Sequence, residues 1–420
     1  MVDRTEPKRR LPYDRQVRFI RVAGPAAAVA SIVLVSGCMA ASVTDSAVTP
    51  QAPSQSGARL ATAPGGSAST DSPTTATSAP GNRQFTVAAN GDILIHNSLW
   101  IQAEQDGHGQ MDFAPQLAGI KAHIASADLA ICHLETPLSN PGGPFANYPV
   151  FNTPPQVTRA IKSTGYDGCS TASNHTLDQG FTGVKRTLDA LDAVGVGHAG
   201  SARTKQESTT PKIYTVKGVK VAHLAYTYGF NGYSVPSAEP WCANTVSAPR
   251  MIADAKAARD AGAEVVIVSM HAGEENVATP NSQQRSVAKA LADSGLVNLV
   301  IGNHVHVVQP AQKIGNMWIV YGHGNLISGQ HVEQHRNREG VVSEFTFTEQ
   351  PGGGFNITKA VGYPVLNTAN PVRLVDLAKS LPKSGGDSRW VEAYQHTRAT
   401  LLSMGAGKDG FIVPAPGSRD

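Results

Sequence analysis

Residues 299–310 read LVIGNHVHVVQP, and this stretch decides which class of fold the chain adopts. Its apolar, β-branched residues indicate a buried strand, yet an Asn and two His interrupt the run where that strand should end. In a strand, residues two apart point to the same face, so we expect His304 and His306 to approach one site together. Polar residues at the end of a buried strand are typical of an open α/β sheet, whose sites lie at the carboxyl ends of its strands.

From Gln84 onward, strand and helix patterns alternate, which predicts an α/β domain over residues 84–365. After His306 the sequence predicts successive antiparallel strands, and residues 366–420 form an extension with one helix, SRWVEAYQHTRATLLSMG. The strand candidates before that point are FTVAANGDILI, ADLAICHL, YDGCSTA, VKVAHLAYT, AEVVIVSM and LVNLVIGN. The helix candidates, several of which end in Gly, are APQLAGIKAHIAS, PQVTRAIKSTG, GVKRTLDALDAVG, PRMIADAKAARDAG and SQQRSVAKALADSG.

The N-terminus has the features of an export signal over residues 1–37. A basic stretch through Arg21 precedes the apolar run VAGPAAAVASIVLVSG, which is shorter than the ~20 residues that span a bilayer. The stretch LVSGC resembles the bacterial lipoprotein box, which predicts lipidation of Cys38; the alternative is an ordinary cysteine of the signal region. Residues 38–83 are rich in Ser, Thr, Pro and Ala and are predicted to be a disordered tether. We therefore expect a lipoprotein on the outer face of the cytoplasmic membrane.

The charge of the chain excludes a general nucleic-acid binder. The net charge is +3, but residues 1–37 hold seven Lys or Arg and only three acids, so the remainder carries −1. No basic face for nucleic acid is therefore expected. The remaining cysteines, Cys132, Cys169 and Cys242, lack metal-binding spacing, so buried thiols are expected, with one disulfide left open.

Polar residues follow several of the predicted strands at or just past their carboxyl ends. A single His at such a place is usually a satisfied structural residue, but a recurring set of carboxylates, an amide and imidazoles is hard to explain in that way, because buried polar groups need partners. One divalent metal would satisfy them together, and this donor set suits Mn, Fe, Zn or Co. The residues are Asp92, Glu135, Asn174, His175, His271, His304 and His306.

The motifs around these residues resemble a known family. In order they are GDILIH, ADLAICHLETPLSN, FNTPPQV, STASNHTLDQGFTGVKRTLDAL, SMHAGEE, VIGNHVHVVQP and VYGHGNLIS. This series resembles the CapA family of capsule and poly-γ-glutamate synthesis proteins, within the calcineurin-like metallophosphoesterase superfamily, over about residues 84–365. The resemblance implies a two-sheet α/β sandwich flanked by helices, with one or two divalent metal ions at a sheet edge. It implies His175 as a general acid, and as metal ligands Asp92, Glu135, Asn174, His271, His304 and His306.

The sequence departs from the superfamily pattern at several positions. The first motif usually reads Asp-x-His, but Leu94 stands at that His, so one metal subsite is a ligand short unless His96 or a water completes it. A single metal and a pair of metals therefore both remain open. His133 stands where the family usually has Asn, and His323 where Leu is common; each is either an extra ligand or a local variation.

Asp178 follows His175 by three residues and has two interpretations. It could hydrogen-bond the His175 ring and support its charged form, as carboxylates do for catalytic imidazoles. It could instead cap the helix that follows, GFTGVKRTLDAL. The sequence does not choose between these roles.

Two functions are compatible with these features. The first is an exported metal-dependent hydrolase of phosphoesters or related cell-envelope bonds. The alternative is a non-catalytic assembly or anchoring factor for an anionic polymer such as poly-γ-glutamate, with a structural metal site. The expected partners are a cell-envelope polymer or phosphoester substrate, the membrane through the N-terminal lipid, and a membrane complex of polymer synthesis. The chain has no P-loop and no GxSxG motif.

Overall fold

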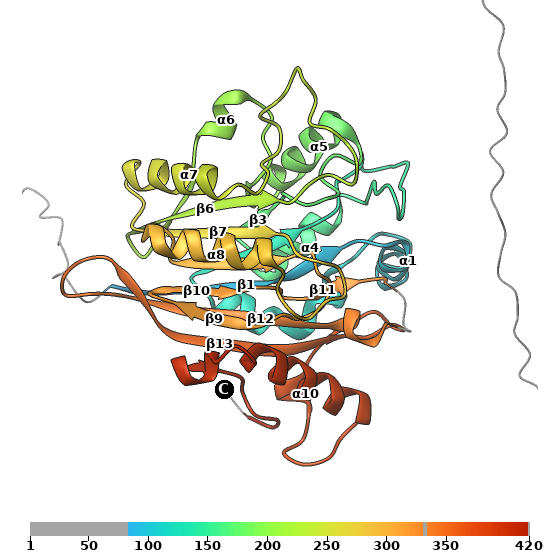
Figure 1. Cartoon of the computed structure of the whole chain (residues 1–420). Coiled ribbons are helices and arrows are strands. Elements are labelled where there is room, and N and C mark those ends of the chain that lie inside the picture. Colours follow the sequence, from blue (N-terminus) through green and yellow to red (C-terminus); the bar gives the residue numbers. More distant parts are fainter. Residues whose placement is uncertain (1–82, 331–333, 419–420) are drawn as a thin grey trace, which may run out of the picture. The chain divides into compact units, whose positions relative to one another are not determined.

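The computed structural model describes residues 83–330 and 334–418, all within one compact unit of the chain, Thr74–Asp420 (Figure 1). The predicted signal peptide, Cys38 and the predicted tether up to residue 82 lie outside the described residues. Among the helices that are described, none combines the length and the apolar character needed to cross a membrane.

Two β-sheets form the centre of the described residues, which confirms the predicted α/β class and its two-sheet arrangement. In the larger sheet the strand order is β14-β13-β12-β1-β2-β3-β4, with β11 also paired to β1 and β15 to β13. These strands are β1 Gln84–Leu94, β2 Leu129–Leu134, β3 Gly168–Ser170, β4 Gly197–Ala199, β11 Asn325–Ser328, β12 Glu339–Glu349, β13 Phe355–Asn367, β14 Leu374–Asp376 and β15 Phe411–Ile412.

The smaller sheet has the strand order β5-β6-β7-β8-β10-β9. Its central strands β6, β7 and β8 run parallel, as do β1, β2, β3 and β4 of the larger sheet. Because parallel strands end at the same edge, the residues that follow them are brought together there. The strands are β5 Lys212–Val216, β6 Val219–Thr227, β7 Val265–His271, β8 Leu299–Asn303, β9 Ala311–Ile314 and β10 Met317–Val320.

The two sheets pack face to face through alternating apolar residues. Phe85 and Val87 of β1 share a buried cluster with Val265 and Ile267 of β7, so this core lies between the sheets. A second cluster joins the other face of the larger sheet to α1 and α4, and a third joins the smaller sheet to α7 and α8 (Figure 1). The helices are α1 Asn97–Asp106, α2 Ala114–Leu117, α3 Lys121–Ser126, α4 Val157–Thr164, α5 Gly180–Ala193, α6 Lys205–Thr209, α7 Ala248–Asp260, α8 Ser282–Ser294, α9 Leu377–Ser380 and α10 Ser388–Leu402.

The predicted helices form as expected, with one exception, and the structure adds α1, which was not predicted from the sequence. Helix α8 begins with a capping box between Asn281 and Gln284 and ends at Gly295, whose φ is +67°. The predicted helix APQLAGIKAHIAS is instead divided into α2, a 3₁₀ turn and α3. At Gly119, within the 3₁₀ turn, a Cβ would lie 1.9 Å from the carbonyl oxygen of Leu374, so glycine permits the close approach of β14.

The region after His306 matches its prediction only in part. Strands β9 and β10 are antiparallel, and so are β12 and β13, as expected. However, β10 pairs parallel to β8, and β11 pairs parallel to β1. The chain therefore returns to both parallel sheets after the site residues instead of forming a separate antiparallel unit.

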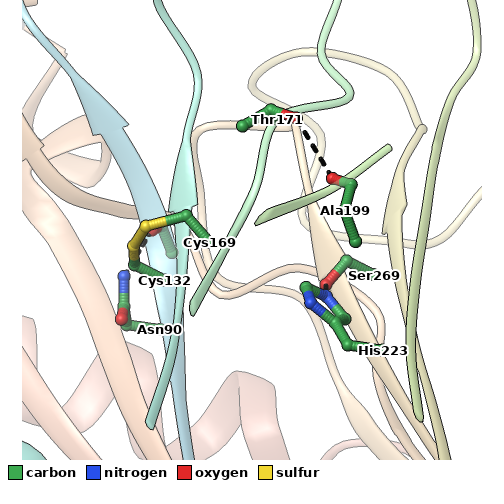
Figure 2. The surroundings of a disulfide bond; sticks show 8 residues. Asn90, Cys132, Cys169, Thr171, Ala199, His223 and Ser269 are labelled. Atoms are coloured by element: carbon green, nitrogen blue, oxygen red, sulfur yellow. Dashed lines mark hydrogen bonds between the residues drawn. A yellow bond between two sulfur atoms is a disulfide. The ribbon is translucent and has the colours of Figure 1, made fainter. Parts of the chain in front are cut away.

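A disulfide joins β2 and β3, contrary to the expectation of buried thiols at these positions. Cys132 and Cys169 lie opposite each other in the parallel ladder, with their Cα atoms 4.4 Å apart (Figure 2). The expectation is confirmed for Cys242, a buried free thiol. It is wrong for the other two because their pairing depends on the register between strands, which cysteine spacing does not reveal.

Candidate metal centre

The predicted ligands converge at the carboxyl edge of the parallel strands. In the larger sheet, Asp92 lies near the end of β1 and Glu135 directly follows β2. In the smaller sheet, His271 is the last residue of β7 and His304 directly follows β8. Both sheets therefore contribute to one cluster. Its predicted members are all buried: Asp92, Glu135, Asn174, His271, His304 and His306.

Two groups of three side chains in this cluster could each hold a cation. In the first, the ligand atoms of Asp92, His133 and His271 all lie within 4.8 Å of one another. In the second, the same holds for Asp92, Glu135 and His306. The two groups share the Asp92 carboxylate, and all five residues are buried.

The Asp92 carboxylate is held by the segment that follows β8. Its Oδ1 accepts a hydrogen bond from the backbone N–H of His304 at 3.3 Å, and its Oδ2 lies 3.1 Å from Nδ1 of His306. The same Nδ1 lies 3.0 Å from Oδ1 of Asn325, so Nδ1 is the protonated nitrogen of this ring. Nε2 of His306 is left facing Glu135, whose Oε1 is 3.9 Å away. A carboxylate that orients a histidine in this way is a common support for a metal ligand.

The electrostatics of the cluster favour a positive charge at its centre. Burial and the negative charge of Asp92 raise the pKa of Glu135 well above its usual value. Burial by itself would lower the pKa of His306. The negative charges of Glu135 and Asp92 outweigh this effect and raise that pKa to about 9. Burial lowers the pKa of His133 to about 4 and that of His304 to about 3, so these rings are neutral, the form that binds metal.

Unsatisfied polar atoms test whether the cluster fits a cation. Both carboxylate oxygens of Glu135, both ring nitrogens of His133, and Nδ1 of His271 and of His304 have no hydrogen-bond partner among the described residues. Buried polar groups are normally paired, so this concentration requires an explanation. Carboxylate oxygens and neutral imidazoles are ligands of Mn, Fe, Zn and Co, and the residues present therefore fit such an ion.

His304 and His306 reach the cluster by a route different from the one predicted. Strand β8 ends at Asn303, and both histidines follow it with left-handed backbone, at φ +94° and +58°. The expectation that strand alternation aims both rings is therefore wrong, although both rings do lie in the cluster. Non-glycine residues with positive φ are uncommon and concentrate at functional sites.

Asn174 and His271 contact each other within the site. Nε2 of His271 lies 2.9 Å from Oδ1 of Asn174, whose Nδ2 donates to Oδ1 of Asn231 at 3.1 Å. The ring of Tyr228 lies over that of His304, with centroids 4.4 Å apart, and is 41% exposed. Tyr228 therefore lies between the buried ring of His304 and solvent.

The two interpretations of Asp178 are resolved by its contacts. Oδ2 of Asp178 lies 2.7 Å from Nδ1 of His175 and also accepts a hydrogen bond from the backbone N–H of Phe151 at 2.7 Å. The N-cap residue, directly before α5, is Gln179, and its side chain makes no capping hydrogen bond. Asp178 therefore orients His175 and does not cap the helix. The ring of Phe151 meets His175 edge-on, at 4.7 Å between centroids.

The three additional histidines differ in their positions. His133 belongs to the cluster, as described above. His323 does not offer a ligand atom, because Nδ1 contacts the carbonyl oxygen of Gly302 at 3.0 Å and Nε2 contacts Oγ of Ser343 at 2.8 Å. Nδ1 of His96 lies 3.2 Å from the carbonyl oxygen of Leu94, and His96 is in neither ligand group.

Some residues of the site were not singled out from the sequence. Asn325 lies within the motif VYGHGNLIS and contacts His306, so the motif carried the signal. Phe151 is the first residue of the motif FNTPPQV, although that motif does not reveal its contact with His175. Tyr228 and Asn231 come from a loop without a recognisable pattern, and only the folded chain places them near the cluster.

A family model and several curated proteins match part of this chain. The family model described as "Bacterial capsule synthesis protein PGA_cap" matches residues 86–330, more than half of the chain. The chain is 30% identical over 216 residues to the PGA biosynthesis protein CapA of Bacillus subtilis (strain 168), which covers 48% of this chain and 53% of that protein. It is 28% identical over 178 residues to the capsule biosynthesis protein CapA of Bacillus anthracis, which covers 42% of this chain and 43% of that protein. The chain thus spans about half the length of the curated relatives it matches.

A solved structure is also similar to this chain. The calcineurin-like phosphoesterase YfkN from Bacillus subtilis has a TM-score of 0.40 at 14% sequence identity. The match covers 77% of this chain and 99% of that chain.

Proposed function

Because this chain belongs to the bacterial capsule synthesis protein family PGA_cap, we propose that it is a metal-dependent hydrolase of phosphoesters or related envelope bonds. We place its action in the assembly of a capsule polymer such as poly-γ-glutamate. The observation that carries the proposal is the His175–Asp178 pair beside the buried carboxylate and imidazole cluster.

The cluster would bind the cation, and His175 would donate a proton to the leaving oxygen. A bound divalent cation, Mn, Fe, Zn or Co, would polarise a phosphoryl oxygen and lower the pKa of water. Asp92, Glu135 and His306 would hold it on one side of the site. His271 is hydrogen-bonded to Asn174, which directly precedes His175 in the chain. The general acid His175 therefore lies next to the cluster.

His175 has the support expected of a general acid. Asp178 fixes its tautomer by accepting the Nδ1–H, which leaves Nε2 to exchange a proton with a leaving oxygen. Phe151 packs edge-on against the ring, and His175 is only 5% exposed, so the ring is held in one orientation. A loose surface histidine would lack both contacts.

The proposal is tested by phosphoesterase turnover. The purified protein is assayed with Mn²⁺ on p-nitrophenyl phosphate and bis-p-nitrophenyl phosphate. We expect His175→Ala to lower kcat by roughly 10²- to 10⁴-fold, the usual contribution of a general acid. Bound Mn²⁺ is measured in parallel, because loss of the acid should leave metal binding intact.

A matched control comes from a second buried pair of the same kind. Nε2 of His123 on α3 lies 2.7 Å from Oδ2 of Asp376 on β14, so His123→Ala removes a similar contact outside the cluster. Its turnover should equal that of the wild type. Bound metal without turnover of any phosphoester by the wild-type protein would contradict the hydrolase. That result would favour the alternative, an assembly factor with a structural metal.

We also propose that the chain is exported and anchored to the outer face of the cytoplasmic membrane through lipid on Cys38. The disulfide between Cys132 and Cys169 supports export, because such bonds persist in oxidising compartments. Labelling of cells with radioactive palmitate should mark the wild-type protein and not Cys38→Ser. Equal labelling, or no labelling of either protein, would contradict the anchor.

A further inference from the structure

His133 is a buried imidazole without any hydrogen bond among the described residues. It lies near the end of β2, 1% exposed, and neither Nδ1 nor Nε2 has a partner. Leaving both nitrogens of a buried ring unpaired costs free energy, because each has given up its hydrogen bond to water. A structural role alone does not account for such a residue.

Other buried histidines of the chain show how the fold normally treats this side chain. His323 is 0% exposed, yet both of its ring nitrogens contact protein oxygens at 3.0 and 2.8 Å. His223 is also 0% exposed and bonds Oγ of Ser269 at 2.9 Å (Figure 2). His123 contacts Asp376 at 2.7 Å. His133 differs from all of these, and it is the one that belongs to a ligand group.

The position of His133 directs its ring toward the cluster. His133 is the register partner of Asp92 in the parallel pairing of β1 and β2, so the two side chains are neighbours across the ladder. Nε2 of His133 lies 3.9 Å from Oδ1 of Asp92, and its ring centroid lies 4.8 Å from that of His271. Meanwhile Oδ2 of Asp92 faces His306. The carboxylate therefore presents one oxygen to each ligand group.

We propose that His133 is the ligand of a second cation position, which it forms with Asp92 and His271 beside the position formed by Asp92, Glu135 and His306. The inference rests on the metal binding that the proposed function requires. Leu94, two residues beyond Asp92 on β1, has no ligand atom. In the proposed second position the imidazole is therefore that of His133, on the neighbouring strand β2.

The number of bound cations tests this assignment without any measurement of activity. The protein is freed of metal, dialysed to equilibrium against Mn²⁺, and its bound Mn²⁺ is counted by mass spectrometry. We expect two Mn²⁺ per chain for the wild type and one for His133→Leu, which has no ligand atom. His133→Ala is made as well, so that poor folding of one variant does not remove the test.

The control variant is His323→Asn, which removes a buried imidazole that has its own partners. It should retain two Mn²⁺. Two Mn²⁺ per chain in the folded His133 variants would overturn the assignment. A single Mn²⁺ per chain in the wild type would also overturn it, and this measurement does not require any variant to fold. A wild type with one Mn²⁺ and His175-dependent turnover would leave the proposed function standing. A wild type that binds no Mn²⁺ would overturn both.

Discussion

His223 shows what burial does to a single imidazole outside the cluster. The ring is fully buried on β6, and Nε2 contacts Oγ of Ser269 at 2.9 Å. Burial, assisted by the neighbouring His133 and Lys212, lowers the pKa of His223 from 6.5 to about 3. The fold therefore keeps this side chain neutral at pH values at which an unfolded chain would protonate it.

This difference predicts a loss of stability in acid. Below pH 6.5 the unfolded state binds a proton that the folded state does not, so the contribution is complete above pH 6.5 and is lost as the pH falls toward 3. At pH 5 the loss is about 2 kcal/mol for this residue. Urea unfolding between pH 7 and 4.5 should therefore show a shallower fall for His223→Gln than for the wild type.

The comparison variant for that series is His108→Gln, on an exposed turn after α1. Water reaches this imidazole in both states, so its pH dependence should follow the wild type. Parallel curves for His223→Gln and the wild type would contradict the prediction.

At the scale of elements, the end of β8 shows where local patterns stop being sufficient. The sequence predicts a strand that ends before His304, and the structure has β8 end at Asn303. What the pattern did not reveal is the left-handed backbone after the strand. Gly302 contributes to this geometry, because a Cβ there would lie 2.0 Å from the carbonyl oxygen of Tyr321. The end of β10 can therefore approach the turn that presents the two histidines.

At the scale of the whole molecule, the site joins the two sheets. Asp92, His133 and Glu135 come from β1 and β2 of the larger sheet, or directly follow them. His271 and His306 come from the ends of β7 and β8 in the smaller sheet. A cation held by both sets binds only the folded chain and therefore stabilises the contact between the sheets.

Metal should accordingly raise the thermal stability of the protein. At Mn²⁺ concentrations about 100-fold above Kd, the expected gain is about 2.7 kcal/mol, or roughly 5 °C in Tm for a domain of this size. Circular dichroism with and without Mn²⁺ measures the shift, and Asp92→Asn should remove most of it. Asp254→Asn, on α7 away from the cluster, should keep it. An equal Tm for the wild-type protein with and without Mn²⁺ would contradict a site that couples the sheets.

The sequence by itself determined the α/β class, the alternation of strands and helices, and the edge at which polar residues collect. These features are local, since hydrophobic periodicity, caps and glycine stops are encoded by neighbouring residues. Only the tertiary structure decided which contacts these residues and their neighbours make. It placed His133 in the cluster and engaged both nitrogens of His323 elsewhere, and it paired Cys132 with Cys169. It also turned Asp178 toward His175. The reason is that these contacts depend on the register of strands and the path of loops far apart in the chain, which no local pattern records.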